Sequence, residues 1–184
     1  MSPALSRRRA VAVVAAVLAL GVAAGLMWFK PWTYVTDTEV DEPLSTIATA
    51  PASPAAPGAS AAPSPAGPTL VSQGEFVGQE FDTSGTARIV RKVDGRYRLE
   101  LVGLDTTNGP DLRVWLTDQP VRPGPGSRGF DDGRWVEVGR LKGNLGNQAY
   151  DIPAGTDLTG LTSVSLWCKR FTISFGAAPL RATV

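Results

Sequence analysis

The sequence predicts an all-β domain over residues 70–184, folded as a β-sandwich or a partly open barrel of about seven short antiparallel strands. Two observations lead to this prediction. Apolar and polar residues alternate with a period of two in successive runs, which is the pattern of strands with one buried face. Glycine and proline separate these runs, and no amphipathic helical period interrupts them.

The N-terminal residues predict a membrane anchor. Arg7–Arg9 precede an uncharged apolar run, Ala10–Phe29, which as a helix is roughly 30 Å long and covers the hydrocarbon core of a bilayer. Trp28 and Trp32 lie where the far interface of the bilayer would be, and the arginines concentrate on the near side. We therefore expect a single-pass protein of the cell membrane, held in the lipid bilayer by this helix. The N-terminus is expected to be cytoplasmic and the C-terminal domain extracytoplasmic.

A linker is predicted between the anchor and the domain. Ala50–Pro68 holds only Ala, Pro, Ser and Gly, so it has too little apolar surface to fold and favours extended conformations that hold the domain off the membrane. The acidic residues within Asp37–Glu42 are interpreted as a solvated spacer. A secretory signal cleaved near Ala23 is the alternative to an anchor, and it also places the domain outside the cytoplasm. The predicted organisation is a cytoplasmic basic N-terminus at 1–9, a transmembrane anchor at 10–29, a Pro/Ala-rich extracytoplasmic linker at 30–69 and the β-domain at 70–184.

The strands of the domain follow from the alternation. Two strand-like runs flank Asp94-Gly95, a pair typical of tight hairpins whose turn requires positive φ at both central positions. In the second run Leu99 and Leu101 share the apolar face, and Glu100 lies on the polar face. The predicted strands are Thr86–Val93, Tyr97–Val102, Leu112–Thr117, Trp135–Val138, Gln148–Ile152, Ser163–Cys168 and Phe171–Phe175. The predicted core residues are Tyr97, Leu99, Leu101, Leu112, Val114, Leu116, Val164, Leu166, Ile173 and Phe175.

The long loop Pro120–Gly133 carries two motifs that we interpret as structural. Gly124, Gly126 and Gly129 match GxGxxG, but a dinucleotide site needs a strand before this fingerprint and a helix after it, and the helix is missing. Asp131-Asp132 suggests hydrolysis or calcium binding. Acid/base chemistry needs a tuned pair of groups and calcium needs six or more oxygens, so a solvated turn is the preferred interpretation.

Composition excludes several classes of site. The 18 basic and 17 acidic residues balance, which is unlike a nucleic-acid-binding surface, and we expect no nucleic-acid partner. The chain has no histidine, which removes the commonest general base and metal ligand. Its single cysteine, Cys168, can form no intramolecular disulfide and no cysteine-pair metal site. No metal site is therefore predicted.

Cys168 is the candidate site residue. Alternation places its thiol with Val164 and Leu166 on the apolar face, and the apolar parity then shifts by one residue, which indicates a bulge or tight turn at Lys169-Arg170. Two interpretations stay open. Burial would make the thiol a packed, inert core residue, whereas two neighbouring cations would lower its pKa and make it reactive.

Three ordered runs in the domain carry a family resemblance. They are Asn108–Leu112; Leu141–Asn144 leading to Gln148, Tyr150, Ile152 and Pro153; and Leu166–Phe171 ending in Phe175–Ala178 and Leu180. Together they resemble the DM-thirteen domain, an electron-transfer domain, in its membrane-anchored bacterial form. The resemblance covers Gly74–Leu180 and implies a small extracytoplasmic β-domain. It also implies that Cys168 is the redox centre, as a naked thiol or as a ligand to a prosthetic group such as haem.

One departure from the family bears on cofactors. Many members place a histidine soon after a Gly-x-Phe-x-Gly run, and here Gly74–Gly78 leads to Phe81 at that position. Since the domain has neither histidine nor methionine, only Cys168 or a tyrosine could hold haem. We therefore expect no cofactor, and haem in particular is disfavoured.

The function predicted from the sequence is redox or electron transfer centred on Cys168, with Lys169 and Arg170 tuning the pKa of the thiol. The partner would be an extracytoplasmic redox protein. The alternative is a non-catalytic module that binds a cell-wall component or a partner protein. A hydrolase that uses Asp131-Asp132 is the weaker third hypothesis, and we do not expect a conventional enzyme.

Overall fold

The computed structural model describes residues 3–29, 36–47, 67–122, 124 and 129–183. The chain divides into two units, one at Met1–Thr36 that holds helix α1 (Pro3–Phe29) and one at Asp37–Val184 that holds all the described strands. The Pro/Ala-rich stretch Ala50–Pro68 lies outside the described residues except for its last two, so its predicted extended conformation stays a prediction.

Helix α1 matches the predicted anchor. Its alanines and leucines have high helix propensity, and they outnumber the two glycines of the run, Gly21 and Gly25. Within it Ala10–Trp28 has a mean hydropathy of 2.6, so the helix is long and apolar enough to cross a membrane.

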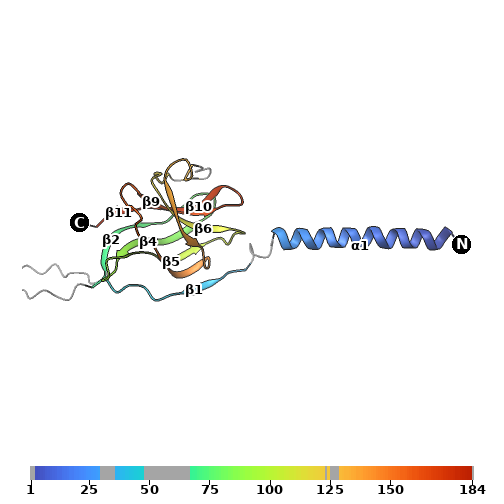
Figure 1. Ribbon diagram of the computed structural model, residues 1–184, viewed down its shortest axis with the longest axis horizontal. Helices are drawn as coiled ribbons and strands as arrows, with labels where there is room; N and C mark the ends of the chain where they lie inside the picture. Colours follow the sequence, from blue (N-terminus) through green and yellow to red (C-terminus); the bar gives the residue numbers. More distant parts are fainter. Residues whose placement is uncertain (1–2, 30–35, 48–66, 123, 125–128, 184) are drawn as a thin grey trace, which may run out of the picture. The chain divides into compact units, whose positions relative to one another are not determined.

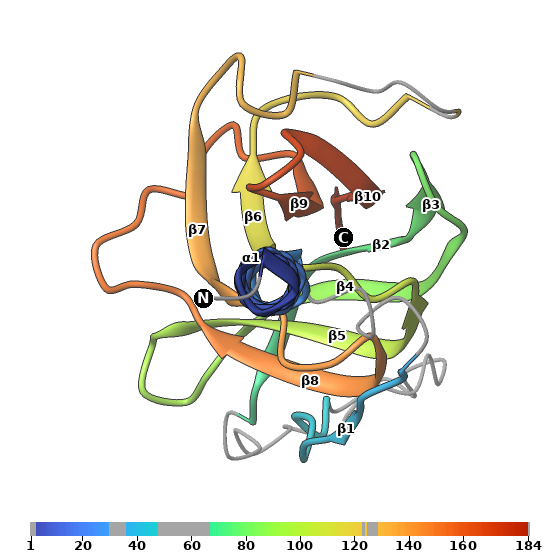
Figure 2. The ribbon, with the colours of Figure 1, turned by 90° about the vertical axis from the view of Figure 1, so that its right-hand side faces the viewer.

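The strands form two sheets packed face to face (Figure 1), so the predicted β-sandwich is confirmed. In Figure 2 strands β6 and β7 run across the direction of β5 and β8. Sheet A has the order β1 (Glu39–Asp41), β8 (Leu145–Asp151), β5 (Tyr97–Thr106), β4 (Thr83–Arg91), β2 (Thr69–Glu75) and β11 (Arg181–Ala182). Sheet B has the order β3 (Val77–Gly78), β10 (Ile173–Pro179), β9 (Ser163–Cys168), β6 (Leu112–Thr117) and β7 (Trp135–Arg140). All neighbouring strands are antiparallel except β1 and β8.

The seven predicted strands correspond to β4 through β10. Ser163–Cys168 and Leu112–Thr117 have the predicted bounds, and the other strands begin or end a few residues away. The additional strands, β1, β2, β3 and β11, lie at or near the sheet margins. Two of them have only two residues, too few to show an alternation in sequence.

The core lies between the inner faces of the two sheets, as predicted. Eight of the ten predicted core residues are buried there, namely Leu99, Leu101, Leu112, Val114, Leu116, Val164, Leu166 and Phe175. Tyr97 and Ile173 are partly buried and pack against this cluster. Complete burial of so many apolar side chains is the main source of stability for a domain of this size.

The hairpin between β4 and β5 forms at Asp94-Gly95, but with a longer turn than predicted. Only Gly95 has a positive φ, at 81°. The N–H of Gly95 donates to the carbonyl oxygen of Lys92 at 2.9 Å. The N–H of Lys92 donates to the carbonyl oxygen of Arg96 at 2.8 Å. Asp94 stabilises the turn through its carboxylate, which accepts from the N–H of Arg96 at 3.0 Å. The loop therefore needs glycine at one position rather than positive φ at two.

Glu100 lies on the predicted polar face of β5, yet it is fully buried. Its carboxylate accepts hydrogen bonds from Arg88 Nε at 2.7 Å and from the backbone N–H of Ser45 at 2.8 Å. Arg88 in turn donates to the carbonyl oxygen of Ser45 at 3.0 Å. The chain around Ser45 therefore covers the outer face of sheet A at this point, and Glu100 is buried because it has both a charged partner and a backbone donor.

The same segment extends sheet A through β1. Asn144 donates to Asp37 Oδ1 at 2.8 Å, and Lys142 Nζ lies 2.7 Å from the carboxylate of Glu42. The interpretation as a solvated spacer is therefore wrong for Asp37, Asp41 and Glu42, because they bind the edge strand β8 and the loop before it. Residues 48–66 connect β1 to β2, two strands of one sheet, so the Pro/Ala-rich stretch does not simply separate the helix from the sheets.

Truncation of Leu166 to alanine tests the core. Leu166 is fully buried on β9, so its loss should reduce the free energy of unfolding by roughly 2–5 kcal/mol, measured by denaturant unfolding. Val93→Ala is the matched control, since Val93 is an exposed turn residue and should change stability by less than about 0.5 kcal/mol. Equal effects of the two substitutions would contradict the inner-face assignment.

Glu42→Gln tests the docking of β1. The hydrogen bond from Lys142 and the N–H of Ala149 lower the pKa of Glu42 against the opposing effect of burial. A lowered folded-state pKa means that the stabilisation is complete above the unfolded value near 4.5 and is lost as the pH falls through the folded value. Glu42→Gln should therefore lower the free energy of unfolding at pH 7 by less than about 1 kcal/mol and have no effect on it at low pH, as measured by denaturant unfolding. Glu39→Gln, an exposed carboxylate on β1, should have no effect at either pH.

Candidate functional site

Cys168 is a core residue. It ends β9 and pairs with Leu112 of β6 on one side and Ile173 of β10 on the other. Its side chain is 0% exposed and belongs to the apolar cluster between the sheets. Of the two interpretations left open by the sequence, the structure supports burial of the thiol.

The residues after Cys168 form the predicted tight turn. The N–H groups of Phe171 and Thr172 both donate to the carbonyl oxygen of Cys168, at 3.3 and 2.9 Å. Thr172 has a φ of 53°, a strained conformation for a β-branched residue. A bulge follows within β10, where the register against β9 shifts between Ser174 and Ala177. Turn and bulge together account for the parity shift seen in the sequence.

Lys169 and Arg170 lie in this turn with exposed side chains. Lys169 Nζ is 3.4 Å from Glu137 Oε2 on β7, so its charge is directed at a carboxylate. The sulfur of Cys168 points instead into the apolar core. The thiol of Cys168 and the ammonium group of Lys169 are neighbours in sequence but lie on different sides of sheet B.

A haem held by Cys168 does not fit this geometry. The thiol lies within a closed apolar cluster with no exposed surface, which leaves no space for a macrocycle beside it. Across residues 3–29, 36–47, 67–122, 124 and 129–183, no group of three His, Cys, Asp or Glu side chains gathers to hold a metal ion.

Three tryptophans stack across the outer face of sheet B. They come from three neighbouring strands, Trp135 from β7, Trp115 from β6 and Trp167 from β9. The ring centroids of Trp115 and Trp135 are 4.1 Å apart with planes 7° from parallel, and those of Trp115 and Trp167 are 5.1 Å apart at 21°. We call these three residues the tryptophan row.

The tryptophan row runs from the surface into the protein. Trp135 is 40% exposed, whereas Trp115 is 3% and Trp167 is 2% exposed. Phe130 and Val121, from the long loop after β6, pack over the buried end. That loop therefore has a structural role, since it shields the row from water.

Glu137 lies beside the row. Its Oε2 accepts a hydrogen bond from Trp115 Nε1 at 3.3 Å, and its Oε1 is 2.8 Å from Arg113 Nη1. Burial alone would raise the pKa of Glu137, but the hydrogen bonds from Trp115 and Lys169 and the nearby positive charges lower it overall. Glu137 is therefore an anion at neutral pH, held against the buried indole.

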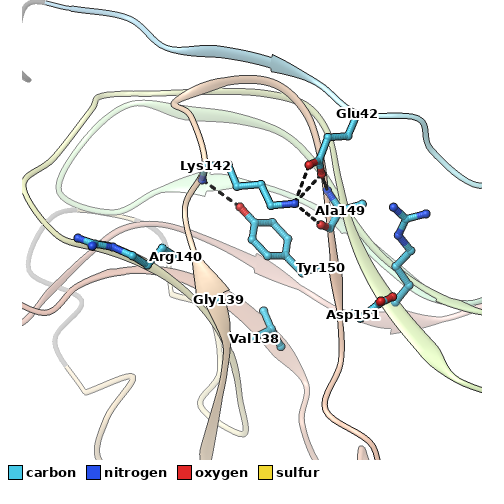
Figure 3. A pocket seen from close by; sticks show the side chains of 9 residues that line it. Glu42, Val138, Gly139, Arg140, Lys142, Ala149, Tyr150 and Asp151 are labelled. Atoms are coloured by element: carbon cyan, nitrogen blue, oxygen red, sulfur yellow. Dashed lines mark hydrogen bonds and ion pairs between the residues drawn. The ribbon is translucent and has the colours of Figure 1, made fainter.

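An open pocket of about 470 Å³ lies between β7 and β8, at the edge covered by β1 (Figure 3). Its floor is Tyr150, whose pKa burial raises above the ordinary value. Lys142 extends over the Tyr150 ring, with Nζ 4.8 Å from the centroid, and it binds Glu42 and the carbonyl oxygen of Ala149. The groups that could bind a ligand here are engaged by the chain itself, so the pocket mainly serves to dock β1.

The tryptophan row was not predicted from the sequence. The available signal was alternation: Trp115 lies between Val114 and Leu116, and Trp167 lies between Leu166 and Cys168. Each tryptophan therefore falls on the face opposite the core. Large aromatic side chains on the outer side of two strands indicate a second apolar layer, and the structure shows that layer to be the row and its covering loop.

Comparison with known proteins identifies the domain. The family model described as Electron transfer DM13 matches residues 75–180, which is more than half of the chain. No curated protein and no solved structure matches. The matched residues include the strands that carry Cys168 and the tryptophan row, and the chain therefore belongs to the electron transfer DM13 family.

Proposed function

We propose that this protein is a single-pass membrane protein whose extracytoplasmic β-unit transfers single electrons. The family match supports an electron-transfer role, and the apolar helix α1 supports a membrane anchor. Arg7–Arg9, which precede the apolar segment Ala10–Trp28 of this helix, support a cytoplasmic N-terminus.

The complete burial of the one thiol carries the proposal of single-electron chemistry. Thiol–disulfide exchange requires a thiolate to attack a sulfur atom directly, and Cys168 has no exposed surface for such contact. Electrons, by contrast, pass between groups that do not touch. Within this proposal Cys168 is one candidate redox centre, and Lys169 and Arg170 would tune it only through space, since Lys169 binds Glu137.

An engineered protease site within residues 50–66 tests the orientation. Protease added to intact cells should cut the chain there, because the β-unit is outside the cytoplasm. The cut fragment is measured on a denaturing gel, since β1 can hold the two pieces together. A chain that is cut only after the membrane is permeabilised would contradict the proposed orientation.

Protein-film voltammetry of the full chain tests electron transfer. A reversible wave should appear for the folded protein, while a maleimide probe should label Cys168 only after unfolding, because the thiol is in the core. Loss of the wave in Cys168→Ala, with folding intact, would assign the centre to the thiol. A wave that persists in Cys168→Ala would place the centre elsewhere in the β-unit.

Two results would contradict these expectations. Rapid labelling of the native thiol would show that the core opens and that disulfide chemistry is accessible. Absence of any wave would remove the electron-transfer role and favour a non-catalytic module that binds a cell-wall component or a partner protein. Ser174→Ala is the control for a small change inside the buried β9–β10 pair.

A further inference from the structure

The tryptophan row provides continuous π contact from the surface to the interior of the β-unit. Trp115 is stacked on both sides, on Trp135 and on Trp167, at the centroid distances given above. Indole is among the most readily oxidised side chains, and an electron passes easily between aromatic rings in van der Waals contact. The row is therefore arranged so that loss of an electron at one ring can be shared with the next.

Exposure gives the row a direction. Trp135 alone has substantial contact with solvent, so an external reactant meets this ring first. Trp115 and Trp167 are covered, which protects an oxidised ring from water and from covalent side reactions. A radical formed by way of Trp135 can thus reside inside the protein.

Glu137 places a negative charge and a proton acceptor beside the indole of Trp115. Its carboxylate stabilises positive charge on Trp115, and the two partly buried groups interact more strongly than they would in water. The same oxygen is the acceptor of the Nε1 proton, which becomes far more acidic when indole loses an electron. Arg113 and Lys169 hold Glu137 in place and keep it ionised.

We infer that the tryptophan row is a redox site in its own right, which gives up one electron through Trp135 to an external one-electron oxidant, an oxidised metal complex or an organic radical. In the forward step the oxidant gains the electron, Trp115 becomes a neutral radical, and its Nε1 proton moves to Glu137. In the return step a one-electron donor reduces the radical and Glu137 gives the proton back. This inference rests on the proposed electron-transfer function and names the site that would carry it.

Stacking by itself also stabilises a fold, so the test must measure redox chemistry. The full chain in detergent, with Trp28 and Trp32 replaced by phenylalanine in every sample, leaves the row as the only source of indole. Photogenerated tris(bipyridine)ruthenium(III) serves as the oxidant, and transient absorption follows the tryptophan radical. Near-ultraviolet circular dichroism checks folding of each variant.

Three substitutions separate the roles. Trp135→Phe should slow radical formation several-fold, because the exposed ring is removed while Trp115 stays buried. Glu137→Gln keeps an oxygen that accepts the hydrogen bond but cannot take the proton, so the neutral-radical spectrum should be replaced by that of the radical cation. Tyr97→Phe, which removes an oxidisable side chain outside the row, should leave rate and spectrum unchanged.

The outcomes distinguish this inference from the proposed function. Radical formation at the same rate in Trp135→Phe, or the same spectrum in Glu137→Gln, would overturn the role of the row. A voltammetric wave with no dependence on the row would leave electron transfer standing and refute the row. Oxidation through Trp135 without any voltammetric wave would establish the row and refute the proposed function. If Trp135→Phe does not fold, Trp135→Leu gives the same comparison, because leucine is apolar and cannot be oxidised.

Discussion

The packing of the two inner sheet faces is the constraint on which the rest of the β-unit depends. Because side chains alternate along a strand, fixing Leu166 in the core also fixes Cys168 in the core and turns Trp167 to the outer face. The thiol and the nearest indole are thus neighbours in sequence but lie on opposite sides of sheet B. Because of this separation the thiol cannot contact another molecule, whereas the tryptophan row lies on the outer face of the sheet.

Local alternation is sufficient to predict much of this fold. The buried face of Leu99, Leu101 and Val114 can be predicted from the alternation of the few residues around each of them. The core was therefore predicted without any knowledge of strand pairing. Glu100 shows the limit of such reasoning, since its partner Ser45 lies 55 residues away and nothing local indicates that the outer face is covered. Strand β1 could not be predicted from the sequence either, because it has only three residues, two of them acidic, and shows no alternation.

The candidate site was predicted only in part, and for a similar reason. Cys168 could be found because it is the single thiol, and its burial followed from parity. The tryptophan row joins residues 115, 135 and 167, so it exists only once β6, β7 and β9 are placed side by side. The role of Glu137 could not be predicted for the same reason, because it depends on a hydrogen bond across the β6–β7 pair.

Identification of the radical formed by one-electron oxidation tests the central claim most directly. Electron paramagnetic resonance of the freeze-quenched full chain, with Trp28 and Trp32 replaced by phenylalanine and the remaining tryptophans deuterated on the indole ring, distinguishes indole from sulfur and phenol. A redox site on the outer face of sheet B predicts a signal that narrows on deuteration, changes in Trp115→Phe and survives in Cys168→Ala. A signal that is unchanged by deuteration and lost in Cys168→Ala would contradict it and return the redox centre to the buried thiol.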